Sequence, residues 1–194
     1  MITIIDYGAN NTDQLENAIS EFNLPFTTTS DEYEILQSDK IILYSESKAD
    51  YAVRRLHLMN FFSMFRMLKK PLLAVGTGMH LLCEHSAEGN VTCLGIIPSS
   101  SLPLTYDDAK EINSGLMKID ILKHGLLFEE ISSEDLFCFE QEYYVPVNDF
   151  TTATAGSTQK ISAVVQHNNF LGIQFNPLKS EAGKKVLKNF LTKF

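Results

Sequence analysis

The side chains best suited to nucleophilic chemistry in this sequence are three cysteines and five histidines. A thiol becomes a catalyst when an imidazole lies beside it to take its proton and a third group orients that imidazole. Cys83, Cys93 and Cys138 are an odd number without metal-ligand spacing, which indicates reduced thiols packed as small apolar groups. No His, Asp or Glu group has the spacing of a metal site, and we expect neither a metal nor a cofactor.

The composition is that of an ordinary globular protein and excludes some classes of partner. Hydrophobic residues make up 44% and charged residues 21%, and the 194 residues fit one domain spanning 1–194. The net charge of −8 repels phosphate backbones and anionic lipid, so we expect no nucleic-acid or membrane binding. The first residues have no basic leader, which favours a cytoplasmic protein.

The elements that would position these side chains alternate in type along the first half of the chain. Short apolar runs predict strands at 1–6, 25–29, 41–44 and 72–75, and helix-compatible stretches lie between them at 12–22, 31–37 and 49–69. Such alternation predicts an α/β fold, a doubly wound, mostly parallel sheet flanked by helices.

The pattern changes after Cys93 to strands separated by turns. We expect strands at 116–122, 136–139, 150–154, 161–166 and 170–175, with a tight hairpin at Asn168-Asn169 and a closing amphipathic helix over 180–194. The C-terminal half should therefore add antiparallel strands to the sheet.

Four segments occur in a distinctive order: Ile4-Ile5-Asp6-Tyr7-Gly8-Ala9, Gly78-Met79-His80-Leu81-Leu82, Leu94-Gly95-Ile96-Ile97-Pro98, and Gly172-Ile173-Gln174-Phe175-Asn176-Pro177-Leu178-Lys179-Ser180. Together with Tyr143-Tyr144, they resemble the class I glutamine amidotransferases, most closely the glutaminase subunits of imidazole glycerol phosphate synthase in histidine biosynthesis. The resemblance spans nearly the whole chain and implies a flavodoxin-like fold. It also implies a Cys-His-Glu triad that frees ammonia from glutamine for a barrel-shaped synthase partner.

The residues at the positions implied for the triad could not perform this chemistry. The turn that should present the cysteine reads Ala74-Val75-Gly76-Thr77-Gly78, which places Gly76 at the nucleophile position. Asn176 and Leu178 occupy the histidine and glutamate positions, and neither an amide nor an alkyl group takes up the thiol proton. We therefore expect no glutaminase activity.

Two further segments depart from the family pattern. Tyr44-Ser45-Glu46-Ser47 replaces the glycine-rich oxyanion loop, and Gln141-Glu142 replaces a His-Ser pair. A carboxylate at Glu46 would oppose the negative charge that develops during acyl transfer.

The resemblance also suggests residues with other roles. The candidates for lining the former glutamine pocket are Ser45, Glu46, Thr77, Gly78, His80 and Gln141, and those for docking a synthase are Asn11 and Lys179. Cys83 lies seven residues after Gly76, which on a helix would place it on nearly the same face about 10 Å away.

Three functions remain open from the sequence. The first is a non-catalytic subunit that binds a barrel-type synthase. The second is an active amidotransferase with a relocated nucleophile, for which Thr77 is the candidate. The third is a stand-alone module that holds a small polar ligand in a pocket rimmed by Gly76, Thr77, His80, Gln141 and Asn176.

Overall fold

The computed structural model describes residues 1–8, 11–107 and 115–194. The strands and helices of its first half are β1 (Ile2–Ile5), α1 (Asp13–Glu21), β2 (Phe26–Thr29), α2 (Glu32–Gln37), β3 (Lys40–Ser45), α3 (Ala49–Leu58), α4 (Phe61–Met67), β4 (Leu72–Gly76), α5 (Thr77–Leu82), β5 (Cys83–Ser86), β6 (Val91–Thr92) and β7 (Ile97–Pro103). Those of the second half are β8 (Leu116–Met117), β9 (Asp120–Ile121), η1 (Leu126–Phe128), β10 (Phe137–Cys138), β11 (Tyr143–Tyr144), β12 (Thr151–Ala155), β13 (Ile161–His167), β14 (Phe170–Ile173) and α7 (Glu181–Lys193). None of the helices in the described part is long and apolar enough to cross a membrane.

The described strands form one large sheet and two small ones. The large sheet has eight strands in the order β2-β1-β3-β4-β14-β13-β12-β9. Its pairs are parallel from β2 to β14 and antiparallel from β14 to β9. The α/β fold with a mostly parallel sheet and antiparallel strands in the C-terminal half is therefore confirmed.

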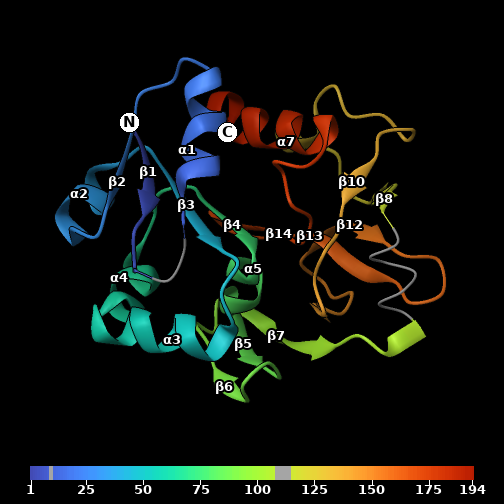
Figure 1. Cartoon of the computed structure of the whole chain (residues 1–194), viewed down its shortest axis with the longest axis horizontal. Helices are drawn as coiled ribbons and strands as arrows, with labels where there is room; N and C mark the ends of the chain where they lie inside the picture. Colours follow the sequence, from blue (N-terminus) through green and yellow to red (C-terminus); the bar gives the residue numbers. More distant parts are fainter. Residues whose placement is uncertain (9–10, 108–114) are drawn as a thin grey trace.

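Helices cover both faces of the large sheet because its central strands are apolar on both sides (Figure 1). Ile42 and Leu73 pack on one face, together with residues of α1 and α7. Ile41 and Leu72, one position earlier in each strand, pack on the other face with residues of α2, α3, α4 and α5. This alternation is the period of two that a strand imposes on its side chains.

Three sequence expectations about individual elements were wrong. The stretch 49–69 forms two helices rather than one, because Asn60 takes a left-handed conformation (φ +58°) that ends the first helix. The stretch 116–122 gives two short strands that belong to different sheets. Cys83 does not continue the helix after Gly76, since α5 ends at Leu82 and Cys83 begins β5.

The elements around the C-terminal hairpin agree with expectation. Asn168 has a positive φ of 53° between the antiparallel strands β13 and β14, as a tight hairpin requires. α7 begins after Ser180, whose hydroxyl accepts a hydrogen bond from the backbone N–H of Gly183 at 3.1 Å. Its buried residues then cover the sheet face that α1 also covers.

Candidate functional site

A pocket of about 290 Å³ opens at the carboxyl ends of β3 and β4 and beside the loop that follows β14. In doubly wound sheets, ligands bind at this edge. The residues that line the pocket come from five segments of the chain: Tyr44, Ser45, Glu46, Val75, Gly76, Thr77, His80, Glu88, Glu140, Gln141, Glu142, Tyr143 and Asn176.

Seven of the residues singled out from the sequence meet in this pocket: Ser45, Glu46, Gly76, Thr77, His80, Gln141 and Asn176. Gly78 was also expected there but is not among the lining residues, and neither is Leu178, at the position implied for the triad glutamate. Gly78 lies on the buried side of α5, where an added Cβ would stand 2.4 Å from the backbone oxygen of Leu43. It therefore sets how closely α5 approaches β3 and does not face the cavity.

The turn from β4 into α5 has the backbone of a sharp strand-to-helix elbow. Gly76 adopts φ +62° and ψ −126°, a backbone conformation that residues other than glycine rarely adopt. A Cβ at this position would lie 2.8 Å from the backbone oxygen of Ser45 and 3.9 Å from Nε2 of Gln141. Gly76 therefore contributes only backbone atoms to the pocket lining. Thr77 follows it as the first residue of α5.

His80 lines the pocket one helical turn after the elbow and is buried (2% exposed). Its Nε2 lies 3.2 Å from Oε1 and 3.1 Å from Nε2 of Gln174, whose amide also donates to the backbone oxygen of Tyr143 at 3.2 Å. Burial lowers the pKa of His80 to about 4, although the hydrogen bond to Gln174 acts in the opposite direction. The imidazole is therefore neutral at pH 7, and its Nδ1 has no hydrogen-bond partner within the described part of the chain.

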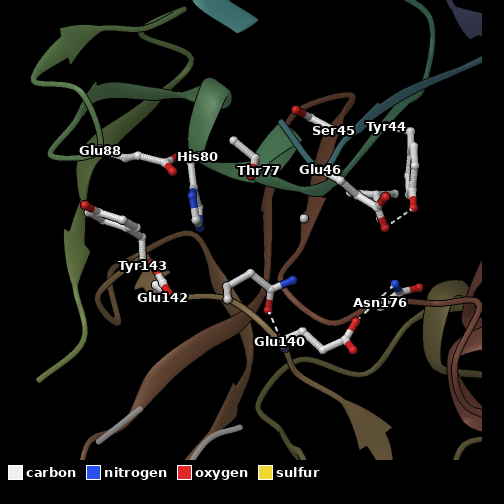
Figure 2. A pocket seen from close by; sticks show the side chains of 13 residues that line it. Tyr44, Ser45, Glu46, Thr77, His80, Glu88, Glu140, Glu142, Tyr143 and Asn176 are labelled. Atoms are coloured by element: carbon white, nitrogen blue, oxygen red, sulfur yellow. Dashed lines mark hydrogen bonds between the residues drawn. The ribbon is translucent and has the colours of Figure 1, made fainter. Parts of the chain in front are cut away.

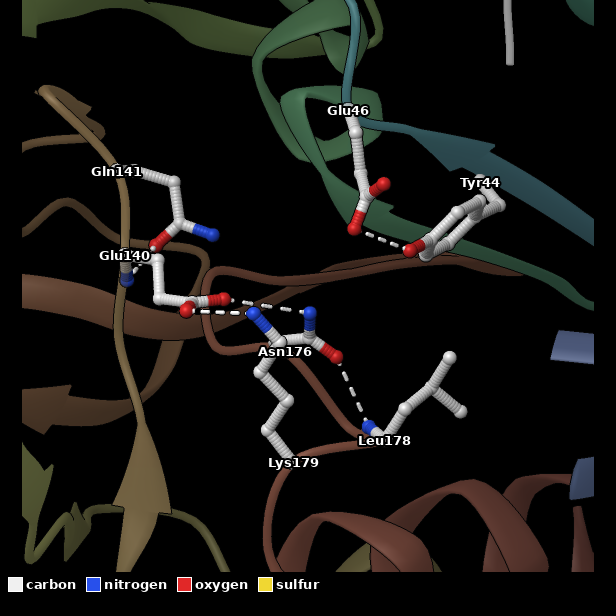
Figure 3. A network of polar contacts seen from close by, with 7 residues as sticks. All are labelled: Tyr44, Glu46, Glu140, Gln141, Asn176, Leu178 and Lys179. Atoms are coloured by element: carbon white, nitrogen blue, oxygen red, sulfur yellow. Dashed lines mark hydrogen bonds and ion pairs between the residues drawn. The ribbon is translucent and has the colours of Figure 1, made fainter. Parts of the chain in front are cut away.

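Asn176 lies in the loop after β14 and is hydrogen-bonded to residues of two segments. Its Oδ1 accepts from the backbone N–H of Leu178 at 2.9 Å, and its Nδ2 donates to Glu140 at 3.4 Å. Lys179 donates to the other oxygen of Glu140 at 2.6 Å. Figure 3 shows this network, with the side chain of Leu178 pointing away from Glu140; that side chain packs against the hydrophobic core.

Glu46 and Tyr44 form a second polar pair on the pocket wall (Figures 2 and 3). The Tyr44 hydroxyl donates to Oε1 of Glu46 at 2.5 Å. Burial, the accepting carboxylate and the negative charge of Glu140 all raise the pKa of Tyr44. Tyr44 therefore stays a neutral phenol and serves as a hydrogen-bond donor.

The three thiols lie away from the pocket lining and none is in a disulfide. Burial raises the pKa of Cys83 and of Cys93, which lie in and beside the small sheet of β5. Burial and the charge of Glu140 also raise the pKa of Cys138. All three are consequently protonated and weakly nucleophilic at neutral pH.

The two candidate docking residues lie on the surface. Asn11 is exposed, and its side chain accepts from the backbone N–H of Asp13 at 2.8 Å at the start of α1. Lys179 forms an exposed ion pair with Glu140. Ala9, which ends the first matching segment, lies outside the described residues.

Seven residues of the site were not named as candidates from the sequence: Tyr44, Val75, Glu88, Glu140, Glu142, Tyr143 and Gln174. All except Glu88 and Glu140 lie in segments that were compared with the family. Tyr44, Glu140 and Glu142 are next in sequence to named candidates, so their place near the pocket could have been inferred from those neighbours. Glu88 had none, because it reaches the pocket from the turn after β5, a strand that the sequence did not predict.

Known proteins resemble this chain over its full length, although no family model matches it. The HisH subunit of imidazole glycerol phosphate synthase from Bacteroides fragilis is 32% identical over 194 residues, 98% of each chain. The HisH subunit from Buchnera aphidicola is 33% identical over 192 residues, again 98% of each. HisH 2 from Legionella pneumophila is 31% identical, with 99% of this chain and 98% of that protein covered.

Solved structures share the fold at low sequence identity. A crystal structure of a glutamine amidotransferase superposes with a TM-score of 0.75 at 10% identity and covers 98% of this chain and 97% of that one. A glutamine amidotransferase from Thermotoga maritima superposes with a TM-score of 0.64 at 13% identity, covering 98% of this chain and 80% of that one. With these folds and with relatives above 30% identity over its whole length, the chain belongs to the class I glutamine amidotransferases, in the family of HisH subunits of imidazole glycerol phosphate synthase.

Proposed function

We propose that this chain is a HisH-type subunit that no longer hydrolyses glutamine and acts as a non-catalytic partner of a barrel-type synthase supplied with free ammonia. The observation that carries the proposal is the elbow at Gly76, which keeps the strained backbone of a nucleophile turn but has no side chain to attack an amide. A covalent acyl intermediate needs a thiolate or hydroxylate at that point.

The surroundings of Asn176 and Leu178 support the same conclusion. The Asn176 amide is engaged by Leu178 and Glu140 and has no basic nitrogen to accept a proton. Leu178 packs against the core and has no carboxylate, so this position cannot orient a base. Removing a whole triad costs about a millionfold in turnover in the serine protease subtilisin, so we expect any remaining rate to be far below that of a subunit with an intact triad.

A relocated nucleophile at Thr77 has weaker support. A threonine hydroxyl needs a base within hydrogen-bond reach, and His80 is the one imidazole that lines the pocket. Nε2 of His80 is already bonded to Gln174. Ammonia release that Thr77→Ala abolishes would establish this alternative.

Docking to a synthase is supported by the position of the two candidate residues. Asn11 follows β1 and Lys179 follows β14, so both lie at the edge of the sheet where the parallel strands end, as the pocket does. The relatives are themselves named as subunits of a synthase. An intact surface at this edge would let the chain assemble even without turnover.

Co-purification tests the docking directly. We expect this chain to co-migrate in size-exclusion chromatography with the barrel synthase of the same organism, and Lys179→Glu to weaken the complex by placing a carboxylate beside Glu140. Lys160→Glu is the matched control, because Lys160 is equally exposed and is also paired with one acid, Asp120. Separate elution of the two wild-type proteins would contradict the docking role.

A further inference from the structure

The space in front of the elbow is already taken by another part of the chain. Apart from the residues next to it in sequence, the atoms nearest to a Cβ built on Gly76 belong to Ser45 and Gln141. The backbone oxygen of Ser45 lies 2.8 Å from that position, and Nε2 of Gln141 lies 3.9 Å from it. A side-chain amide from the segment between β10 and β11 is therefore in van der Waals contact with the nucleophile position.

A substrate of the family's reaction would need the same space. Before a nucleophile attacks, the reacting atoms lie about 3–3.5 Å apart, and the attacking atom is one bond beyond Cβ, so the substrate carboxamide lies at about 4 Å from that Cβ. The amide of Gln141 is at this distance from the Cβ position of Gly76. It is also the same chemical group, because the side chain of glutamine is a primary carboxamide wherever it occurs.

The Gln141 side chain faces the pocket and is not free to leave it. Figure 3 shows its amide nitrogen on the side toward Glu46, across the pocket. The residue is half-buried, and its Oε1 accepts from the backbone N–H of Glu140 at 3.1 Å. This hydrogen bond turns the nitrogen end of the amide toward the elbow.

The backbone on both sides of Gln141 is also fixed. The backbone oxygen of Cys138 accepts from the N–H of Asn176 at 2.8 Å, and that of Glu142 accepts from the N–H of Leu104 at 2.8 Å. Between them, the Glu140 carboxylate accepts from Asn176 at 3.4 Å. The segment that carries Gln141 is therefore attached to the loop after β14 and to the end of β7.

A group attached in this way competes well with a free ligand. A tethered group acts at an effective concentration of the order of millimolar or higher, and it does not lose translational freedom when it occupies its site. Free glutamine would have to displace the Gln141 amide to present its own amide to the elbow.

We infer that Gln141 occupies the place of the substrate amide and makes this pocket closed to glutamine, so that the chain has lost the ligand as well as the chemistry. The inference deepens the proposed function and rests on it, because a pocket that turned over glutamine would have to admit it. A synthase assembled with this subunit would not sense glutamine through it.

Nuclear Overhauser spectra of the full-length wild-type chain test the contact directly. The side-chain amide protons of Gln141 should give a cross-peak to the Hα protons of Gly76, and Gln141→Glu should remove it. Gln159 is the internal control, because it is also half-buried and bonded to the backbone of the next residue but does not line the pocket. A spectrum without the cross-peak from Gln141 to Gly76 would overturn the inference.

Access to the elbow can also be measured with iodoacetamide, a small alkylating reagent that is itself a primary carboxamide. Gly76→Cys places a thiol at the elbow, and adding Gln141→Ala should speed its alkylation about tenfold, as followed by peptide mass spectrometry. Gly125→Cys is the matched control, since nothing lies within 4 Å of a Cβ there, and Gln141→Ala should leave its rate unchanged. Equal rates at the elbow with and without Gln141 would contradict the inference.

Calorimetry and thermal unfolding of the wild-type chain test the consequence for binding. Glutamine at about 10 mM should produce neither binding heat nor a rise in melting temperature. Binding of glutamine without ammonia release would overturn this inference and leave the proposed function standing. Ammonia release would instead contradict the proposed function itself.

Discussion

The elbow after β4 and the loop after β14 lie side by side, since the two strands are parallel neighbours, yet they keep their shapes by different means. At the elbow, Gly76 holds a left-handed backbone and Gly78 allows α5 to approach Leu43 closely. In the loop, hydrogen bonds of Asn176 to Leu178 and Glu140 hold the chain. Steric constraints fix the first region, and side-chain polar contacts fix the second.

The difference indicates which parts of the site the proposed loss of glutaminase activity would leave in place. Backbone that packs against a neighbouring strand is required by the fold, so the elbow can persist without its nucleophile. In the loop, Asn176 and Lys179 both donate to Glu140, and such side-chain contacts can change without moving the backbone. Substitutions in the two regions should accordingly differ in how much they lower the folding stability.

The largest effect is expected at Gly78, where an added Cβ meets the backbone oxygen of Leu43 at 2.4 Å. Because backbone cannot give way as a side chain can, Gly78→Ala should destabilise the fold by at least about 3 kcal/mol. Chemical denaturation measures this, with Gly125→Ala as the control, since nothing lies within 4 Å of a Cβ there. Equal stability of the two variants would mean that α5 is not fixed against β3.

The second-largest effect is a pH dependence of the folding stability that comes from His80 on α5. In the unfolded chain His80 takes up a proton near pH 6.5, whereas burial lowers its pKa to about 4 in the folded chain. Between these values the unfolded state binds more protons, so stability falls as the pH drops from 6.5 to 4, by about 3 kcal/mol, and levels off below. Urea titrations across this range should show a smaller fall in His80→Gln than in wild type or in His124→Gln.

Substitution of Gly76 should lower the folding stability less than substitution of Gly78. Gly76→Ala places a Cβ in a left-handed conformation and 2.8 Å from the oxygen of Ser45, which should destabilise the fold by about 2 kcal/mol. The same denaturation experiment measures it. A neutral substitution would indicate that the elbow relaxes once a side chain is present.

The smallest effect is expected in the loop after β14. Asn176→Ala removes the acceptor for the backbone N–H of Leu178 and the donor to Glu140, at a cost of about 1 kcal/mol. Asn176→Asp keeps the acceptor but adds a charge beside Glu140, so its instability should lessen at high salt. A larger loss for Asn176→Ala than for Gly76→Ala would reverse the comparison between the two regions.

The sequence predicts the parallel sheet well because strands buried on both faces are short, apolar and regularly spaced. It does not predict the small sheet of β5, β6, β7 and β11, since Cys83-Glu84-His85-Ser86 has neither an apolar run nor strict alternation. The helix break at Asn60 was missed for a similar reason, because apolar residues continue across it on both sides.

The residues of the candidate site could likewise be placed only where the sequence predicts the strand that carries them. Ser45 and Gly76, which end β3 and β4, could be placed from the sequence because their strands could be predicted. Leu178 could not, because it lies in the loop well beyond the end of β14, where its side chain packs against the core. The acidic character of the pocket depends on Glu88 and Glu140, which reach it through loops whose paths no local pattern encodes.

Ammonia release from glutamine tests the central claim most directly. The assay should use the chain with its barrel synthase and the synthase substrate, since activity in an assembly can depend on both, and with a catalytically competent HisH subunit as the positive control. We predict no release above the rate of the synthase alone. Release that depends on this chain would contradict the account, and its loss in Thr77→Ala would identify the nucleophile that the elbow at Gly76 lacks.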